Sequence, residues 1–289
     1  MTTKEIARAI TVVENELEGF EQLLQSLPVN NSIPVIGITG PPGAGKSTLV
    51  DALIGQMVAD NKKVAVLCVD PSSPFNLGAV LGDRIRMSNW YVHPGVYIRS
   101  LATRGSLGGL HPKIIEITEI LKAADFDYII VETVGVGQSE IEIAGLADAT
   151  IVVVVPEGGD EVQTMKAGLM EIADIFVVNK SDRPGADQYV KNLRLMLAPA
   201  FHTHQQEIAV VKCIASSGEG VPALWDAVQA YLSSSQFNDR KAWLLAEKTY
   251  QIIAGKRMKE VDKHQLQQKI GTLLQQGKFN LYAFANQHS

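Results

Sequence analysis

The fold of this chain is decided by the stretch GITGPPGAGKST, which occupies residues 37–48 and follows a short apolar run. Within it, Gly40, Gly45, Lys46 and Ser47 match the pattern G-x-x-x-x-G-K-[ST] of a phosphate-binding loop. In such a loop a strand leads into a glycine-rich turn whose backbone N–H groups wrap phosphate oxygens, and a helix begins near the lysine. The required order of strand, turn and helix disfavours a chance match. The sequence therefore predicts a site for a nucleoside triphosphate.

We expect nine consecutive residues to contact the phosphates, namely Gly40, Pro41, Pro42, Gly43, Ala44, Gly45, Lys46, Ser47 and Thr48. The Lys46 ammonium would reach the β- and γ-phosphates, and the Ser47 hydroxyl would bind Mg²⁺. The positive end of the following helix dipole would favour the same anion.

Length and composition are those of an ordinary globular protein. The 289 residues suffice for one large α/β domain with extensions or for two small domains. Hydrophobic residues make up 46% of the chain and charged residues 20%, as in typical globular domains. The net charge of −5 gives no reason to expect a nucleic acid partner.

The sequence carries neither a membrane-spanning pattern nor a secretion signal. The aliphatic run at residues 151–155 is too short to span a bilayer, and the N-terminal segment carries acidic residues among its apolar ones. Cys68 and Cys213 lie in apolar, strand-like segments, so we expect core residues rather than a disulfide or a metal pair. We therefore expect no membrane insertion and a cytoplasmic location.

Apolar segments rich in Val and Ile alternate with helical patterns along most of the chain. The expected strands are Val35–Thr39, Val64–Val69, Gly95–Ser100, Tyr128–Glu132, Thr150–Val155, Ile175–Val178 and Ile208–Cys213. The expected helices between them are Ser47–Asp60, Pro112–Ala124, Glu161–Ile172 and Ala186–Leu197. Strands without polar alternation are buried on both faces, as in a parallel sheet. This order predicts an α/β, doubly wound, mainly parallel sheet that binds ligands at the carboxyl ends of its strands.

Both ends of the chain have a helical pattern instead. Near the N-terminus, apolar residues spaced by four and three predict one amphipathic helix that carries Ile6, Ile10, Val13, Leu17, Phe20, Leu24 and Leu27. Packing on its own domain and contact with another subunit both remain open for this helix. Near the C-terminus, a helix face formed by Leu266, Ile270, Leu273 and Leu274 is followed by Gly277, which could end the helix. The apolar tail at 279–284 then needs cover from its own core or from a partner subunit.

The tetrapeptide Asn179-Lys180-Ser181-Asp182 directly follows a predicted strand and matches the N-K-x-D pattern of guanine recognition. The Asp182 carboxylate can accept hydrogen bonds from guanine N1–H and from the exocyclic amine, whereas adenine lacks this donor pair. The Lys180 stem can pack over the base, and Asn179 can tie its loop to the phosphate-binding turn. After the last strand, the Ala215 backbone N–H is expected to meet guanine O6.

Carboxylates end two of the predicted strands. Asp70 ends the second strand and Glu132 ends the fourth, where both can hold Mg²⁺ directly or through its waters. Gly135 lets the backbone approach the γ-phosphate. The next residue is Val136, where Ras-like enzymes carry a glutamine that orients water, so slow hydrolysis that a partner or a dimer accelerates is expected.

Two further segments combine glycines with charges. Residues 81–87 place Asp83 after a glycine and beside basic side chains, and residues 157–163 precede Lys166 on a predicted helix. Such segments suit loops that reorder around a γ-phosphate, although solvated surface loops would have the same composition.

Taken together, the motifs GPPGAGKST, DPSSP, LGDRIRM, ETVGVGQSE, PEGGDEVQ and NKSD resemble the MeaB/MMAA/ArgK family of GTPases, from about Ile33 to Leu232. The resemblance implies a P-loop NTPase fold of the SIMIBI type with helical extensions at both ends. It implies a homodimeric GTPase chaperone that uses GTP and Mg²⁺ and serves an adenosylcobalamin-dependent acyl-CoA mutase, typically methylmalonyl-CoA mutase. Such proteins gate cofactor delivery and protect the mutase from inactivation.

The resemblance also assigns residues and domains. The catalytic residues would be Lys46, Asp83, Glu132 and Lys166, and the metal ligands would be Ser47, Asp70, Asp83 and Glu132. Residues 160–166 would form a third switch that responds to the mutase. The domains would be an N-terminal helical extension at 1–30, a P-loop GTPase domain at 31–235 and a C-terminal helical dimerisation arm at 236–289.

Two other functions remain as alternatives. A kinase or transport ATPase is compatible with the phosphate loop, although Asp182 argues against ATP. A metal-insertion GTPase of the nickel-chaperone type would need clustered Cys and His ligands, and the one close histidine pair is His202 and His204.

Overall fold

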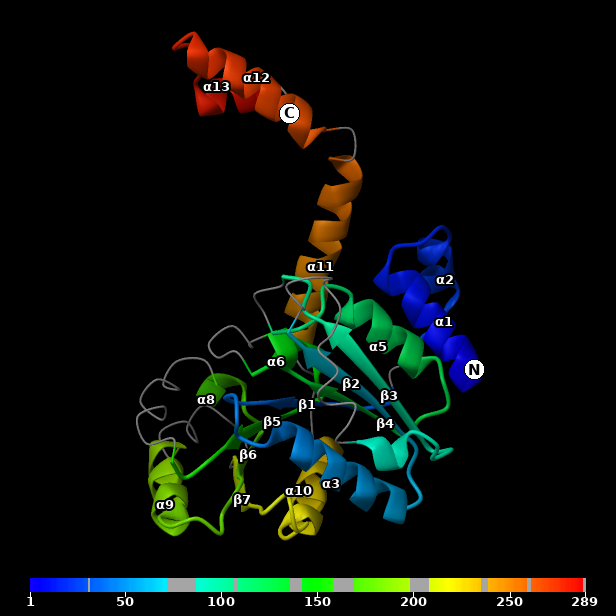
Figure 1. The fold of residues 1–289 in the computed structure, drawn as a ribbon, viewed down its shortest axis with the longest axis vertical. Helices are drawn as coiled ribbons and strands as arrows, with labels where there is room; N and C mark the ends of the chain where they lie inside the picture. The colour runs from blue at the N-terminus through cyan, green and yellow to red at the C-terminus, as the bar shows by residue number, and fades with distance from the viewer. Residues whose placement is uncertain are drawn as a thin grey trace. The chain divides into compact units, whose positions relative to one another are not determined.

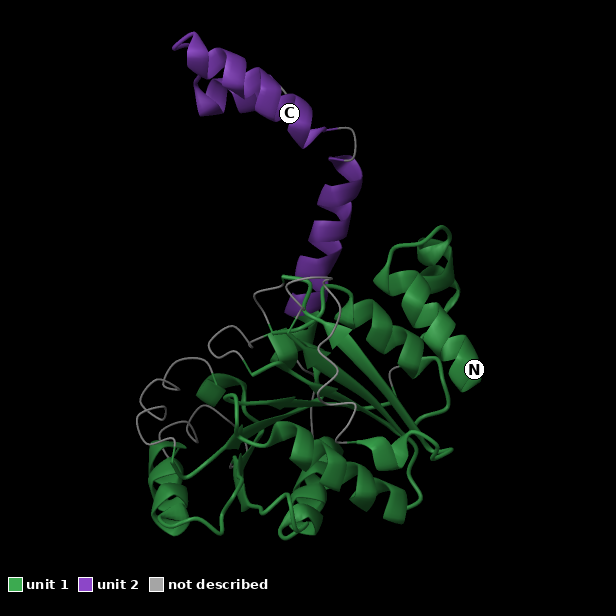
Figure 2. Ribbon diagram, in the orientation of Figure 1, with its two compact units in different colours: residues 1–242 green, residues 243–289 purple. Residues whose placement is uncertain are grey.

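A parallel sheet forms the centre of residues 1–242, the first of two compact units of the chain (Figures 1 and 2). The computed structural model describes residues 1–30, 32–71, 87–105, 109–135, 142–157, 169–197, 208–234, 239–258 and 261–287. Among these residues the sheet has seven strands in the order β3-β2-β4-β1-β5-β6-β7. The strands are β1 (Val35–Thr39), β2 (Val64–Asp70), β3 (Val96–Ala102), β4 (Tyr128–Glu132), β5 (Ala149–Val154), β6 (Ile175–Val178) and β7 (Ala209–Lys212).

Helices cover both faces of the sheet, as a doubly wound fold requires (Figure 1). One face is covered by α3 (Lys46–Ala59) and α10 (Val221–Ser234), and the other by α5 (Ile114–Lys122) and α6 (Glu142–Leu146). The remaining described helical elements of the first unit are α1 (Thr3–Glu14), α2 (Phe20–Ser26), η1 (Ser88–Trp90), α8 (Leu169–Ile172), α9 (Ala186–Leu197) and the start of α11 (Asp239–Arg257). The predicted fold class is confirmed.

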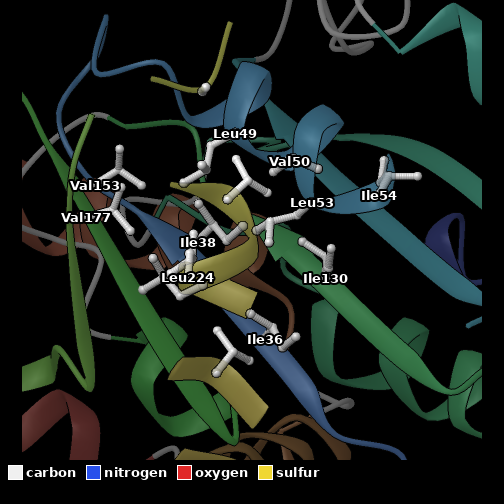
Figure 3. Close-up of a cluster of buried hydrophobic side chains, with 14 of the residues drawn as sticks. Ile36, Ile38, Leu49, Val50, Leu53, Ile54, Ile130, Val153, Val177 and Leu224 are labelled. Carbon is white, nitrogen blue, oxygen red and sulfur yellow. The ribbon is translucent and has the colours of Figure 1, made fainter. Parts of the chain in front are cut away.

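The largest core cluster lies between the sheet and the helices α3 and α10 (Figure 3). Ile36 and Ile38 of β1 point into this cluster together with Leu53 of α3 and Leu224 of α10. Gly37, between the two isoleucines, faces the opposite side, where an added Cβ would lie 2.6 Å from Ile143 Cγ1 of α6. Both faces of β1 are therefore closely packed, which fixes where the phosphate loop leaves the sheet.

The continuous Val/Ile runs located the strands well. The predicted bounds are exact for strands β1, β4 and β6 and for helix α9. For the other predicted strands, and for the predicted helices at 47–60 and 112–124, the ends differ from the structure by at most two residues. For the predicted helix at 161–172, only α8 falls within the described residues.

The N-terminal segment forms two helices, so the prediction of one helix was wrong. Helix α1 begins with a capping box made by Thr2 and Glu5. Glu16 and Gly19 then adopt left-handed backbone conformations (φ of 48° and 86°), which a right-handed helix cannot continue through. Leu17 falls on the predicted apolar stripe, but in this turn it is 48% exposed. The spacing of apolar residues alone does not reveal a break in the helix.

The second unit, residues 243–289, is helical in its described part. Besides the rest of α11 it contains α12 (Lys263–Gln275) and α13 (Leu281–Asn286). Gly277 ends α12 as predicted: its φ is 66°, and the N–H groups of Gly277 and Lys278 donate to the carbonyls of Leu274 and Leu273. Within the described part of this unit Phe284 is the one buried side chain, and its ring contacts Phe279.

Trp225 offers a test of the core on the α3 and α10 side. Its side chain is 1% exposed, packs edge-on against Tyr128, and donates from Nε1 to Asp60 Oδ2 at 2.7 Å. Trp225→Ala should lower the free energy of unfolding by about 3–5 kcal/mol, because it leaves a cavity and an unpaired carboxylate oxygen. Trp225→Phe keeps most of the ring volume and should cost clearly less. Urea unfolding measures both, and equal losses in the two variants would contradict this account of the packing.

Candidate functional site

The carboxyl ends of the strands surround a cavity of about 410 Å³. Its lining residues come from the end of β2, from the loops after β1, β2, β4 and β6, and from the start of α3: Pro42, Gly43, Gly45, Lys46, Ser47, Thr48, Val69, Asp70, Pro71, Thr133, Val134 and Lys180. This is the edge at which doubly wound sheets bind ligands. Six of the nine predicted phosphate-loop residues, together with Asp70 and Lys180, therefore line one space.

A second hollow of about 490 Å³ lies at the other end of the sheet, between α9 and β7. It is lined by exposed side chains such as Lys191, Arg194 and Lys212, and Lys212 is paired with Asp187 at 2.8 Å. It holds no glycine-rich turn or helix N-terminus, so we place the site at the phosphate loop.

The phosphate loop ends at Gly45, which directly precedes α3. Gly45 has φ of 90°, and an added Cβ would lie 2.4 Å from the Asn179 amide nitrogen. A side chain at this position would both strain the backbone and displace Asn179. The loop therefore delivers the N-terminus of α3 to the cavity with no side chain in between, as an anion site requires.

The Lys46 side chain crosses the mouth of the loop. Its ammonium donates to Gly40 O at 2.9 Å and to Pro41 O at 3.2 Å, and the residue is 6% exposed. Gly135 faces the same ammonium, because an added Cβ there would lie 2.1 Å from Lys46 Nζ. The Lys46 charge is thus held between the loops that follow β1 and β4.

A hydroxyl and two carboxylates lie beside the lysine. Ser47 Oγ donates to Glu132 Oε1 at 2.7 Å. Asp70 and Glu132 end the neighbouring strands β2 and β4 and are 5% and 3% exposed. Oxygen donors of this kind suit Mg²⁺, which usually keeps several waters. The described residues contain no group of three His, Cys, Asp or Glu side chains able to hold a metal, so phosphates and water would complete the ligand set.

Asn179 joins the base loop to the phosphate loop, as predicted. Its Nδ2 donates to Ala44 O at 2.8 Å and its Oδ1 accepts from the Ala215 N–H at 3.1 Å, with 2% of the residue exposed. Lys180 adds a second link, from Nζ to Gly43 O at 2.7 Å. The Ala215 amide already has a protein acceptor, so guanine O6 would have to share it. Asp182 is exposed, two residues beyond Lys180.

The structure adds two threonines that the sequence reasoning did not single out. Thr133 Oγ1 donates to Thr39 Oγ1 at 3.1 Å, and both residues are almost fully buried. The Thr133 N–H also donates to Ile38 O, and its side chain lines the cavity. The position of Thr133 between Glu132 and Gly135 was the available signal in the sequence.

Several predicted residues lie outside the described part of the chain. They are Asp83, Val136, Asp160, Lys166, His202 and His204. Their predicted roles in switching, catalysis or metal transport stay predictions.

Two ionisable groups near the site have shifted pKa values. The hydrogen bond from Arg183 lowers the pKa of the exposed Glu157 carboxyl and links the loop after β6 to the loop after β5. Burial raises the pKa of the Cys213 thiol to about 12, so this cysteine stays protonated at neutral pH. A protonated, buried thiol is a poor metal ligand.

The chain is similar to known proteins over most of its length. A family model described as methylmalonyl-CoA mutase-associated GTPase MeaB matches residues 6–269. A protein of Pyrococcus horikoshii that is named as a GTPase is 43% identical over 267 residues, which cover 89% of this chain and 84% of that protein. The mouse protein named methylmalonic aciduria type A homolog, mitochondrial, is 33% identical over 273 residues, which cover 83% of this chain and 64% of that protein.

A solved structure agrees with the fold. The crystal structure of an LAO/AO transport system kinase has a TM-score of 0.66 to this chain at 26% identity, and the match covers 98% of this chain and 90% of the other. Within the described residues, no helix combines the length and the apolar character needed to cross a membrane.

Asn179→Ala should weaken both the fold and the site. The substitution leaves Ala44 O and Ala215 N–H buried without this partner, which should cost about 1–3 kcal/mol in free energy of unfolding. It should also weaken nucleotide binding, because the phosphate loop loses its link to the base loop. Urea unfolding and titration with fluorescent GDP measure the two effects. Asn192→Ala, which removes an exposed amide paired with Gln188 on α9, is the matched control and should change neither.

Proposed function

We propose that this chain, which belongs to the MeaB family of methylmalonyl-CoA mutase-associated GTPases, assists cofactor loading and protection of an adenosylcobalamin-dependent acyl-CoA mutase. The chain is a GTPase, like the family and the relatives that match it. The observation that carries the proposal is the family match across residues 6–269, together with a cavity that the phosphate loop lines. The name of the mouse relative, which refers to methylmalonic aciduria, supports the same partner.

Guanine selectivity would come from the loop after β6. Asp182 is exposed near Lys180, whose side chain already spans to the phosphate loop at Gly43. A base seated there would face a carboxylate able to accept from guanine N1–H and the exocyclic amine. Adenine would leave that carboxylate unpaired, which discriminates strongly.

Hydrolysis requires a water oxygen to attack the γ-phosphorus while the bond to the β–γ bridging oxygen breaks. Lys46 would stabilise the charge that gathers on the phosphate oxygens, because its ammonium lies between the loops that follow β1 and β4. Ser47, Asp70 and Glu132 would hold Mg²⁺, which neutralises the β- and γ-phosphates when bound. Since Val136 stands where a water-orienting glutamine is common, we infer that hydrolysis is slow until a partner completes the site.

The second unit supports a homodimer. Its described part exposes large apolar side chains that include Trp243, Tyr250, Ile252, Ile253 and Tyr282. Exposed apolar surface of this extent is typical of an interface, and a second copy of the chain is the partner that the family resemblance implies. A cytoplasmic location is part of this proposal, and the net charge of −5 disfavours a nucleic acid partner.

The two alternative functions have less support than the mutase-associated GTPase. The solved relative is called a transport system kinase, which favours a kinase or transport ATPase, but N-K-S-D argues for guanine over adenine. A metal-insertion GTPase would need soft ligands near the surface, whereas Cys68 and Cys213 are buried.

The proposed partner predicts a kinetic result. GTP turnover should be slow for the chain alone and should rise at least about tenfold with a cognate cobalamin-dependent mutase, as a missing catalytic group is supplied. Phosphate release with GTP and with ATP, each with and without the mutase, measures this. If no cognate mutase accelerates GTP turnover, the proposed partner is wrong, whereas the assignment of the chain as a GTPase stands.

The Asp182→Asn variant tests the selectivity of the site for guanine over adenine. It replaces an acceptor-only carboxylate with an amide, so GTP binding should weaken by about two orders of magnitude and the preference over ATP should shrink. Competition between the two nucleotides for a fluorescent analogue measures the change. Lys46→Ala serves as the comparison, because it should weaken both nucleotides without altering their ratio. An unchanged preference in Asp182→Asn would remove the main residue of the guanine argument.

A further inference from the structure

The chain turns sharply directly after β3, at Arg104 and Gly105. Their φ angles are 47° and 81°, so both residues adopt the left-handed conformation. Glycine adopts it readily, but a residue with a side chain does so only at a cost in free energy. The conformation of Arg104 therefore has to be maintained by contacts.

Those contacts come from the end of α1, 90 residues earlier in the chain. Arg104 Nη1 donates to Glu14 O at 2.9 Å, and Nη2 donates to Glu14 Oε1 at 3.2 Å and to Asn15 Oδ1 at 2.9 Å. The other carboxylate oxygen of Glu14 accepts from Arg99 Nη2 of β3 at 2.8 Å. The Glu14 side chain is 13% exposed, so solvent screens these charged hydrogen bonds only in part. The planar guanidinium of Arg104 is thus fixed in position and orientation.

The same turn borders the candidate metal site. The Thr103 N–H donates to Asp70 O at 3.1 Å, which continues the pairing of β2 with β3 beyond Ala102. Further along the same connection, Gly109 O accepts from the Val134 N–H at 3.4 Å. The described ends of this connection therefore contact the backbone at the end of β2, where Asp70 lies, and in the loop two residues after Glu132 of β4.

Helix α1 is held in place within the first unit by its packing. Its residues Ile6, Ala9, Ile10 and Val13 are buried, and the helix packs on α5. Glu14 is therefore held at a definite place beside the end of β3.

We propose that Arg104, clamped by Glu14, is a positioning residue for metal-bound nucleotide. The clamp holds the turn after β3 in its left-handed conformation, and the turn holds the backbone of Asp70 so that its carboxylate faces the cavity. The N-terminal helix is then part of the nucleotide machinery, and its detachment weakens Mg²⁺ binding. This inference rests on the proposed Mg²⁺ role of Asp70.

The test measures the Mg²⁺ concentration that gives half-maximal tight binding of fluorescent GDP. Arg104→Ala loses the clamp and keeps the unfavourable backbone conformation, so this concentration should rise about fivefold or more. Arg104→Gly also loses the clamp, but glycine adopts the turn unaided, so the rise should be smaller. Glu14→Gln, which preserves size, should lie between wild type and Arg104→Ala. GDP affinity without Mg²⁺ should change less than about twofold in all three, because the phosphate loop is untouched.

Glu16→Gln is the matched control. Glu16 belongs to the same segment and forms an ion pair with Lys113, which precedes α5. A purely structural role for Glu14 would lower the thermal midpoint of the Glu14 and Glu16 variants alike and leave the Mg²⁺ requirement unchanged, which would overturn the proposal.

Asp70→Asn separates this inference from the function on which it rests. If Asp70→Asn raises the Mg²⁺ requirement and Arg104→Ala does not, the positioning role is refuted and the metal role stands. If Asp70→Asn has no effect, the metal role of Asp70 fails, and the route from Arg104 through Asp70 fails with it.

Discussion

The Asn179 side chain joins three loops that lie far apart in the sequence. Its amide group pairs with Ala44 of the phosphate loop and with Ala215 after β7, while its own backbone N–H donates to Val154 O at the end of β5. These hydrogen bonds are buried, so breaking one leaves an unpaired polar group rather than a solvated one. The Gly45 backbone approaches the Asn179 amide so closely that no side chain fits between them. The shape of the nucleotide site therefore depends on a contact between residues 135 positions apart in the chain.

The sheet and most of the site could be predicted from the sequence because their signals are local. Runs such as Ile175–Val178, rich in Val and Ile, indicate strands, and the phosphate loop, Asp70, Glu132 and Asn179 each directly follow or end such a run. Parallel strands with their carboxyl ends at one edge bring these residues together, so spacing along the chain was enough to place them.

What could not be predicted depends on distant partners or on single backbone angles. The break between α1 and α2 follows from left-handed residues at Glu16 and Gly19, and an apolar stripe continues across such a break without a change in spacing. The clamp on Arg104 joins residues about 90 positions apart, and no periodicity marks either one. Likewise, the sequence around Ala215 suits a contact with guanine, but only the structure, in which the two loops are neighbours, shows that the Ala215 N–H donates to Asn179.

The helices of residues 243–289 have almost no core of their own. Phe284 is the one buried side chain in the described part of this unit, whereas a stable small domain needs many. Isolated helices of this length are marginal in water, so burial against another surface has to supply most of their folding free energy. For the homodimer proposed above, folding and association of these helices would be a single equilibrium, in which the helical fraction follows the concentration of the second copy.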